Sequence, residues 1–316
     1  MVLITRARTS AFLLRRSLST SSKSSSYSSS SSSSSPLPSI IGGIAVTLAL
    51  SAGGAVYQEN SAECATLARR NTRANTIQEN YIDNCIGNTK LVYLKSLSEE
   101  TKCKIYGKAE YQNPSGSVKD RTVMGIIQDA ERSGRLQPGG TIVEGTGGNT
   151  GISLAQLGAS KGYKIILTAP SNVSQEKIDQ YERFGAEIHL APSGHTFDHP
   201  DNYARKAEKI VAATPGALYA NQFENLANYR VHFSTTGPEI YSQTNGAVDA
   251  FVCSSGTGGT IGGVSSFLKM AKPDCKVFLI DPTGSVLFDY VTSGKTKGAQ
   301  VRAGQSPCIR HFYVVG

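Results

Sequence analysis

The chain has 316 residues, 39% of them hydrophobic, which is enough for one or two domains with buried cores. Its formal net charge is +8, with 32 basic and 24 acidic residues, but five basic residues and no acidic ones lie before residue 59. The rest of the chain therefore holds 27 basic against 24 acidic residues. This balance leaves no broad basic surface, so we expect no nucleic-acid partner.

Residues 1–35 are rich in arginine and serine and contain no acidic residue. A serine run from Ser24 to Ser35 is interrupted only by Tyr27. This composition is typical of a mitochondrial targeting segment, so we expect a mitochondrial protein. A disordered basic tail is the alternative.

Residues 36–57 are uncharged and rich in Ile, Val, Leu, Ala and Gly. The segment has about the 20 residues that a membrane span requires, and it predicts one transmembrane helix that anchors the protein in a mitochondrial membrane, outer or inner. A remnant of a cleaved presequence, or a linker, is the alternative. Residues 58–80 are polar and predict a linker, and residues 81–316 form the remaining domain.

The six cysteines are widely spaced and form no CxxC pair, which favours free thiols in a reducing compartment. The five histidines are equally scattered, and no group of cysteines and histidines has the spacing of a zinc site. We expect no metal site.

From residue 81 onwards, short apolar segments alternate with helical patterns. Strands are predicted at residues 91–94, 104–109, 141–144, 164–168, 186–190, 250–253 and 277–280. Helices are predicted after Arg121, after Gly151, and at residues 175–184 and 261–270. The alternation predicts an α/β fold with a mostly parallel sheet and helices on its faces.

A loop rich in turn-forming residues, from Asn113 to Ser117, leads to Lys119. The apolar residues after Arg121 follow helical spacing, so the loop places Lys119 at the start of a buried helix. A single lysine at such a junction is usually an ordinary solvated charge. Two later glycine-rich turns make this lysine a candidate functional residue.

One of these glycine-rich turns lies between the predicted strand at 250–253 and the predicted helix at 261–270. Glycines let the backbone approach an anion, and a helix N-terminus presents free N–H groups to it. A phosphate is the expected guest of Gly256, Thr257, Gly258, Gly259 and Thr260. A dinucleotide fingerprint, GxGxxG, is the alternative, but the position of Gly262 breaks its spacing.

The other turn follows the predicted strand at 141–144. Thr146, Asn149 and Thr150 would place hydroxyl and amide groups at the carboxyl edge of the sheet, where open α/β sheets bind ligands. A carboxylate or a ring hydroxyl would suit these donors. A polar helix cap is the alternative.

A lysine, a phosphate cup and a polar loop together indicate pyridoxal phosphate. The lysine amine forms a Schiff base with the cofactor aldehyde, and the ring acts as an electron sink. The cup would hold the phosphate, and the polar loop would hold the ring oxygen or the substrate carboxylate.

Three motifs in this order, NPSGSVKDR, EGTGGNTG and SGTGGT, resemble the cysteine synthase and cystathionine β-synthase family. The sequence IGNT, followed by Leu91 and Val92, is similar to the start of that family's domain. The resemblance covers about residues 82–285 and implies the tryptophan synthase β-like fold, fold type II of the pyridoxal-phosphate enzymes, with two three-layer αβα subdomains. The leader and the segment 281–287 look most like the fungal mitochondrial branch.

The resemblance also implies roles for single residues. Lys119 would be the Schiff-base lysine and the base that removes the substrate α-proton. Asn149 would hydrogen-bond the ring hydroxyl, and residues 256–260 would hold the phosphate. The loop expected to close on the substrate carboxylate contains Thr146, Gly147, Asn149 and Thr150, and Gln222 matches a glutamine of the substrate loop.

The implied reaction is β-replacement, in which an O-activated serine such as O-acetylserine reacts with sulfide to give L-cysteine. Cystathionine β-synthase or serine/threonine dehydratase activity is the alternative within the family. A non-catalytic binding or regulatory protein that retains the fold is the alternative from another class. The family also implies a homodimer.

The sequence departs from the family pattern at three places. Gly147 stands where the family has serine, which removes a carboxylate-binding hydroxyl worth about 1.5–3 kcal/mol. Leu226 replaces a proline. The last eleven residues, SPCIRHFYVVG, match nothing expected. We therefore expect a truncated C-terminal part, without the residue that would contact the pyridine nitrogen and with core surface exposed.

Overall fold

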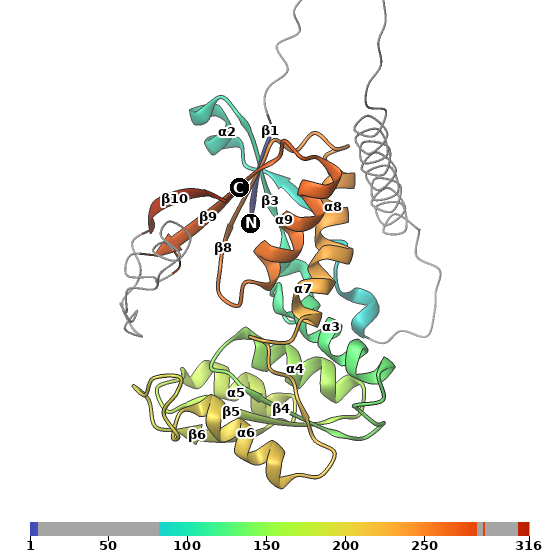
Figure 1. Cartoon of the computed structure of the whole chain (residues 1–316), viewed down its shortest axis with the longest axis vertical. Coiled ribbons are helices and arrows are strands. Elements are labelled where there is room, and N and C mark those ends of the chain that lie inside the picture. Colours follow the sequence, from blue (N-terminus) through green and yellow to red (C-terminus); the bar gives the residue numbers. More distant parts are fainter. Residues whose placement is uncertain (6–81, 283–286, 288–308, 316) are drawn as a thin grey trace, which may run out of the picture.

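The computed structural model describes residues 1–5, 82–282, 287 and 309–315, the last range as backbone only. The predicted transmembrane helix at 36–57, the linker and most of the predicted targeting segment lie outside these residues. Within the described residues, no helix is long and apolar enough to cross a membrane. The described chain forms two lobes, each built on one sheet, with α3 and α7 between them (Figure 1).

The lower lobe in Figure 1 contains a four-stranded sheet in the order β6-β5-β4-β7. All three strand pairs are parallel, as the sequence predicts. The three longer strands lie within two residues of their predicted bounds, whereas the two-residue β7 has no pattern to predict it. The strands are β4 (Thr141–Gly145), β5 (Lys164–Pro170), β6 (Glu187–Ala191) and β7 (Leu218–Tyr219).

Helices cover both faces of this sheet, because successive side chains of a strand point to opposite faces. Ile142 and Leu167 face a core shared with the first three helices below, whereas Val143 and Ile166 pack against the fourth. This lobe therefore has the three layers that the family resemblance implies. The helices are α3 (Lys119–Arg132), α4 (Asn149–Ser160), α5 (Gln175–Arg183) and α6 (Tyr203–Ala213).

The upper lobe contains a six-stranded sheet in the order β10-β9-β8-β1-β3-β2. Only β8 and β9 pair in parallel, so the prediction of a mostly parallel sheet is wrong here. Apart from the βαβ unit made by β8, α9 and β9, its strands come from segments that are distant in sequence. They are β1 (Val2–Thr5), β2 (Leu91–Tyr93), β3 (Lys104–Lys108), β8 (Ala250–Ser254), β9 (Lys276–Pro282) and β10 (Ile309–Val315).

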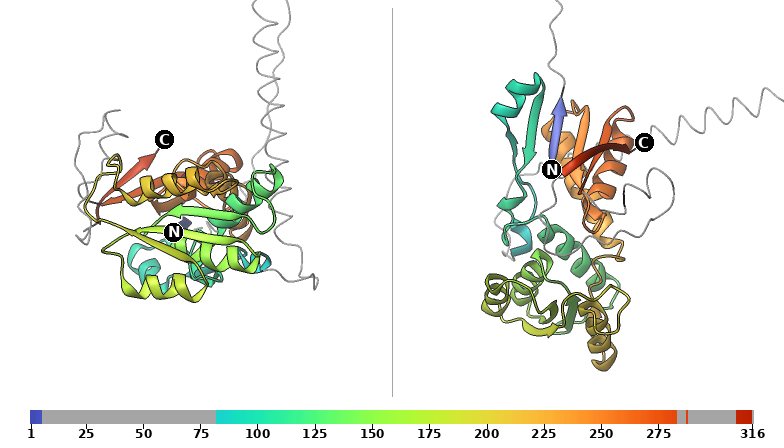
Figure 2. Two further views of the ribbon diagram at one scale, coloured as in Figure 1. Left: turned by 90° about the horizontal axis from the view of Figure 1, so that it is seen from below. Right: turned by 90° about the vertical axis from the view of Figure 1, so that its left-hand side faces the viewer.

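The first strand, β1, lies in the interior of this sheet, antiparallel to both β3 and β8 (Figure 2). Its Leu3 side chain is fully buried in the core of the lobe. These residues belong to the segment predicted to be a targeting sequence. A single membrane crossing at residues 36–57 would put β1 and the rest of the sheet on opposite sides of a bilayer, so that prediction disagrees with this pairing.

One face of the six-stranded sheet packs against α8 and α9, through Phe251 and Val277 on the strands and Ile240 and Phe267 on the helices. The helices of this lobe and of the region between the lobes are α2 (Lys95–Thr101), α7 (Ala227–Val231), the π-helix η3 (His232–Thr236), α8 (Gly237–Gln243) and α9 (Gly259–Ala271). Two short 3-10 turns are η1 (Ile82–Cys85) and η2 (Glu110–Gln112).

The C-terminal segment that matches nothing in the family forms β10, which pairs antiparallel with β9 over Val277–Pro282. It thereby covers one edge of β9, in the C-terminal part that the sequence predicts to be truncated.

Candidate active site

Lys119 is the first residue of α3 and follows the predicted loop. Asp120 holds this loop in place, because its carboxylate accepts hydrogen bonds from the Ser115 N–H (2.7 Å), the Ser115 hydroxyl and the Ser153 hydroxyl of α4 (2.5 Å). The amide of Asn113 donates to the Ser117 carbonyl at 3.0 Å. The loop is therefore fixed at both ends, and the position of Lys119 is fixed with it.

A buried ion network lies behind the loop. The Arg121 guanidinium is fully buried and contacts Glu110 at 2.8 Å and Glu239 at 2.7 Å, and the Lys108 ammonium contacts Glu239 at 2.6 Å. The two cations balance the two carboxylates, and these partners lower the pKa of Glu239 to about 2 despite burial. The network joins α3 to β3 and α8.

The Lys119 amine faces a cavity of about 370 Å³, which is within the range of small-molecule sites. Burial lowers the pKa of Lys119, and the nearby Glu144 carboxyl opposes this shift. A lysine with a lowered pKa is more often uncharged and so a better nucleophile. The other candidate residues lining the cavity are Gly256, Thr257, Gly258 and Thr260.

The predicted phosphate cup lies at the turn between β8 and α9, beside this lysine. Lys119 Nζ donates to Thr257 Oγ1 at 3.4 Å. Gly258 has a φ of +82°, a conformation that favours glycine, and among the described residues no side-chain hydrogen bond caps the start of α9. The N–H groups at this helix start and the Thr257 and Thr260 hydroxyls suit a phosphate.

The second predicted loop lies at the carboxyl end of β4, outside the residues that line this cavity. Thr150 is buried and its hydroxyl donates to Gln222 Oε1 at 2.6 Å, so these two candidate substrate-binding residues lie together. Thr146 is buried and accepts from the Gly148 N–H at 3.2 Å, and Gly147 accepts from Lys177 at 3.3 Å. Asn149 is exposed at the start of α4.

Asn228 connects the phosphate cup to the pair formed by Thr150 and Gln222, although no sequence motif marks it. Its amide donates to the Gln222 carbonyl at 3.0 Å and to Thr257 Oγ1 at 2.9 Å. Its carbonyl oxygen accepts from the Thr122 hydroxyl at 2.9 Å. A continuous chain of hydrogen bonds therefore runs from Thr150 to the phosphate cup.

Glu144 is a second site residue that the sequence analysis missed, although it stands directly before the second glycine turn. Its side chain is almost completely buried, and one oxygen, Oε2, has no hydrogen-bond partner within the described residues. Burial raises its pKa to about 8, against the opposing N–H groups of Gln222 and Asn221. Its carboxyl group therefore helps to hold the Asn221–Gln222 turn.

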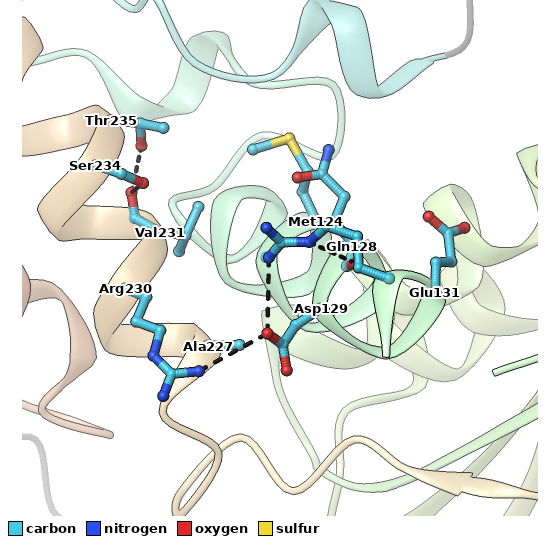
Figure 3. A pocket seen from close by; sticks show the side chains of 11 residues that line it. Met124, Gln128, Asp129, Glu131, Ala227, Arg230, Val231, Ser234 and Thr235 are labelled. Atoms are coloured by element: carbon cyan, nitrogen blue, oxygen red, sulfur yellow. Dashed lines mark hydrogen bonds and ion pairs between the residues drawn. The ribbon is translucent and has the colours of Figure 1, made fainter. Parts of the chain in front are cut away.

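Another pocket, of about 310 Å³, lies between α3 and α7 (Figure 3). Arg132 and Arg230 both line it and form ion pairs with Asp129, at 3.6 Å and 3.7 Å. The residues of the phosphate cup do not line it. It therefore borders the far sides of the helices that carry Lys119 and Asn228.

Two of the histidines that the sequence shows as scattered come together on the loop before α6. The rings of His195 and His199 stack with centroids 3.8 Å apart, and Asp201 lies beside them. His199 Nδ1 already accepts from the Asp201 N–H at 3.2 Å. The group is partly exposed, and nothing around it indicates a ligand.

Comparisons with known proteins agree with this geometry. A family model described as "Pyridoxal-phosphate dependent enzyme" matches residues 82–307. Cysteine synthase 1 of Emericella nidulans is 52% identical over 216 residues, which cover 68% of this chain and 58% of the relative. Cystathionine beta-synthase of Dictyostelium discoideum is 42% identical over 211 residues, which cover 67% and 42%.

Among solved structures, O-ureido-L-serine synthase matches with a TM-score of 0.62 and 35% identity, over 67% of this chain and 66% of that one. The chain spans somewhat more than half the length of the cysteine synthases it matches. The predicted resemblance to the cysteine synthase and cystathionine β-synthase family and the fold type II architecture are thus confirmed, and the mitochondrial branch stays a prediction. The chain belongs to the pyridoxal-phosphate-dependent enzyme family, in its cysteine synthase and cystathionine β-synthase group.

Proposed function

We propose that this chain forms L-cysteine by β-replacement, from O-acetylserine or another O-activated serine and sulfide. The observation that carries the proposal is the pairing of Lys119 with the phosphate cup in one cavity, with Nζ 3.4 Å from Thr257 Oγ1. The relatives named cysteine synthase support the nucleophile.

The residues present fit pyridoxal phosphate. The α9 N-terminus, Thr257 and Thr260 would hold its phosphate, and the half-buried Lys119 amine would bind its aldehyde. When bound, the cofactor withdraws electrons from the substrate α-carbon and makes its proton acidic. Lys119 Nζ would then take that proton, for which its lowered pKa prepares it.

The polar loop after β4 would bind the substrate. Thr146, Gly147 and Thr150, with Gln222, would present hydroxyl and N–H groups to a carboxylate, and Asn149 would reach the ring hydroxyl of the cofactor. Because Asn149 is exposed and the residues of this loop do not line the cavity, the proposal includes an approach of the loop to the cup when substrate binds.

Cystathionine β-synthase activity is the second candidate, favoured by the relative of that name. Serine/threonine dehydratase activity needs the same lysine and cup. The absence of a hydroxyl at Gly147 favours a third reading, a protein that binds the cofactor without turnover. Sulfide and homocysteine as alternative nucleophiles separate the first two, and water as the only productive nucleophile identifies the dehydratase.

The test is the visible absorbance of the chain with pyridoxal phosphate, before and after borohydride. A yellow species that borohydride fixes to Lys119, and that Lys119→Ala abolishes, supports the cofactor role. Cysteine formed on adding O-acetylserine and sulfide supports the reaction. A folded protein that takes up no cofactor contradicts the proposal.

For the assembly and location, we infer a homodimer, as in the family resemblance, and a mitochondrial protein, from the acid-free, arginine- and serine-rich residues 1–35. We do not carry forward the single membrane crossing, because β1 and β3 belong to one sheet. The mass in solution by light scattering tests the first inference. Localisation of a C-terminal fluorescent fusion, with and without residues 6–35, tests the second.

A further inference from the structure

The helix that starts at the phosphate cup, α9, lies directly on α7 and η3. Two glycines on one side of α9 allow this approach. A Cβ at Gly259 would come within 2.2 Å of the Asn228 amide, and a Cβ at Gly263 within 2.4 Å of the Tyr229 carbonyl and 2.8 Å of His232 Cβ. Any larger residue would push the helices apart, so the two glycines bring the side chains of α7 and η3 to the cup.

Asn228 and His232 are four residues apart and both reach the cup from this neighbouring segment. Asn228 donates to Thr257 Oγ1 at 2.9 Å, and His232 Nε2 lies 3.1 Å from Thr260 Oγ1. The two threonines are the hydroxyl-bearing residues of the GTGGT turn.

Both side chains are themselves held from behind. Asn228 is 3% exposed and accepts from Thr122, three residues after Lys119, while His232 is fully buried and its Nδ1 lies 2.9 Å from Thr236 Oγ1. Burial lowers the pKa of His232 to about 3, so the ring is neutral and has one donor and one acceptor nitrogen. Each side chain therefore has a fixed orientation toward the hydroxyl that it contacts.

We propose that Asn228 and His232 are the positioning residues of the phosphate cup, which orient the Thr257 and Thr260 hydroxyls toward a bound phosphate. A hydroxyl can rotate about its C–O bond, so its direction depends on its partners. Thr257 accepts from Asn228, and its own proton is then free to point at an anion. The π-helical turn that carries His232 is the local irregularity that aligns the second contact.

Asn228 also links this positioning to the substrate side, because its amide donates to the Gln222 carbonyl. The inference rests on the proposed function in one respect: it takes the ligand of the cup to be the phosphate group of the cofactor.

The test compares the affinity for pyridoxal phosphate with that for pyridoxal, which lacks the phosphate, on the full chain. Asn228→Ala is expected to raise the Kd of pyridoxal phosphate about tenfold and that of pyridoxal less than twofold. Asn225→Ala is the matched control, because Asn225 makes two hydrogen bonds in the same loop, to Ala220 and Ala227, and none to the cup. Asn225→Ala should leave the ratio of the Kd of pyridoxal to the Kd of pyridoxal phosphate unchanged.

A double-mutant cycle separates positioning from a general structural role. In a Thr257→Val background, Asn228→Ala should change the Kd of pyridoxal phosphate less than twofold. The same cycle with His232→Gln and Thr260→Val tests the second pair and decides the question if Asn228→Ala does not fold. The inference is wrong if Asn228→Ala raises the Kd of pyridoxal phosphate and of pyridoxal equally. It is also wrong if Asn228→Ala has its full effect on the Kd of pyridoxal phosphate in the Thr257→Val background.

The two proposals fail differently. A wild-type chain that prefers pyridoxal phosphate in this way but forms no cysteine contradicts the proposed reaction and leaves the positioning role standing. A wild-type chain that makes cysteine while Asn228→Ala keeps the normal ratio of affinities contradicts the positioning role alone.

Discussion

The two sheets of this molecule are assembled in different ways. The four-stranded sheet uses one continuous stretch, residues 141–219, in which each strand is followed by a helix. The six-stranded sheet combines strands from residues 2–5, 91–108, 250–282 and 309–315. The first lobe can form from local contacts, whereas the second requires pairing between distant parts of the chain.

The candidate site draws on both lobes, and the elements that join them carry its residues. Lys119 begins α3, the cup belongs to the six-stranded lobe, and the substrate loop follows β4 of the other. Asn228 on α7 contacts α3 through Thr122 and the cup through Thr257. It reaches the loop after β4 indirectly, through Gln222, which accepts from Thr150. We call the elements that join the lobes, among them α3 and α7, the junction. Depending on its position, a mutation is therefore expected to damage one lobe, the junction, or the site alone.

The largest effect is expected at the junction, from Arg121→Met. Removing the guanidinium leaves Glu110 and Glu239 buried with too little positive charge, which costs about 3–5 kcal/mol of unfolding free energy. Urea unfolding monitored by circular dichroism measures it. Arg205→Met removes an exposed ion pair to Glu208 and should leave the unfolding curve unchanged. Equal curves for both variants would mean that the buried network does not stabilise the junction.

Leu3→Ala tests whether the N-terminal strand belongs to the core of the six-stranded lobe. Because Leu3 is fully buried, the substitution should cost about 2–5 kcal/mol, as should Leu167→Ala in the other lobe. Leu97→Ala, at a side chain that is 47% exposed, is the control and should cost less than about 0.5 kcal/mol. If Leu3→Ala behaves like this control in urea unfolding, β1 does not stabilise the sheet.

The same contrast explains what the sequence could predict. Strands such as 164–168 are apolar, bounded by turns and followed by helices, so their position follows from local pattern. Four residues at the N-terminus carry no such pattern, and their place between β3 and β8 depends on the gap that those strands leave. The short β7 and the π-helix η3 were missed for the same reason.

The site divides in the same way. Lys119 and the GTGGT turn are recognisable because their chemistry requires a lysine, glycines and hydroxyls at fixed places along the chain. Asn228 and Glu144 act through hydrogen bonds to residues far away in sequence, and an asparagine or glutamate in isolation does not indicate that. Only the packing of α7 against α9, and the burial of β4, identifies them.

Glu144→Gln is expected to change how stability depends on pH. The folded pKa of Glu144 is about 8, above its ordinary value of 4.5. Between these values the folded state keeps a proton that the unfolded state has lost, so the stability contributed by the neutral form decreases as pH rises. Relative to Glu144→Gln, the wild type should lose at most about 1.4 kcal/mol per pH unit across this window.

Urea unfolding of both proteins from pH 5 to pH 8 measures this difference. Glu208→Gln is the control, since Glu208 lies on α6, which packs against the same sheet, and its partner Arg205 stays charged throughout this range. Its difference from the wild type should stay flat over this range. If the unfolding free energies of the wild type and of Glu144→Gln change with pH in parallel, Glu144 is ionised in the folded protein.

The smallest effect on stability, and one confined to the site, is expected from Gly147→Ser. A Cβ at Gly147 would lie 3.1 Å from Pro170 Cδ, so the proline ring must move by a few tenths of an ångström, which we expect to cost less than about 1 kcal/mol. The added hydroxyl supplies a donor for the substrate carboxylate, and one hydrogen bond to a charged group, at about 1.5–3 kcal/mol, corresponds to a roughly 10- to 150-fold lower KM for O-acetylserine. Gly147→Ala adds the same Cβ without the hydroxyl, so it should share the small loss of stability and leave KM at the wild-type value or above it. If both variants lower KM alike, the gain comes from a stiffer loop. If neither does, the Gly147 loop does not bind the carboxylate, and the proposed reaction needs another site for that group.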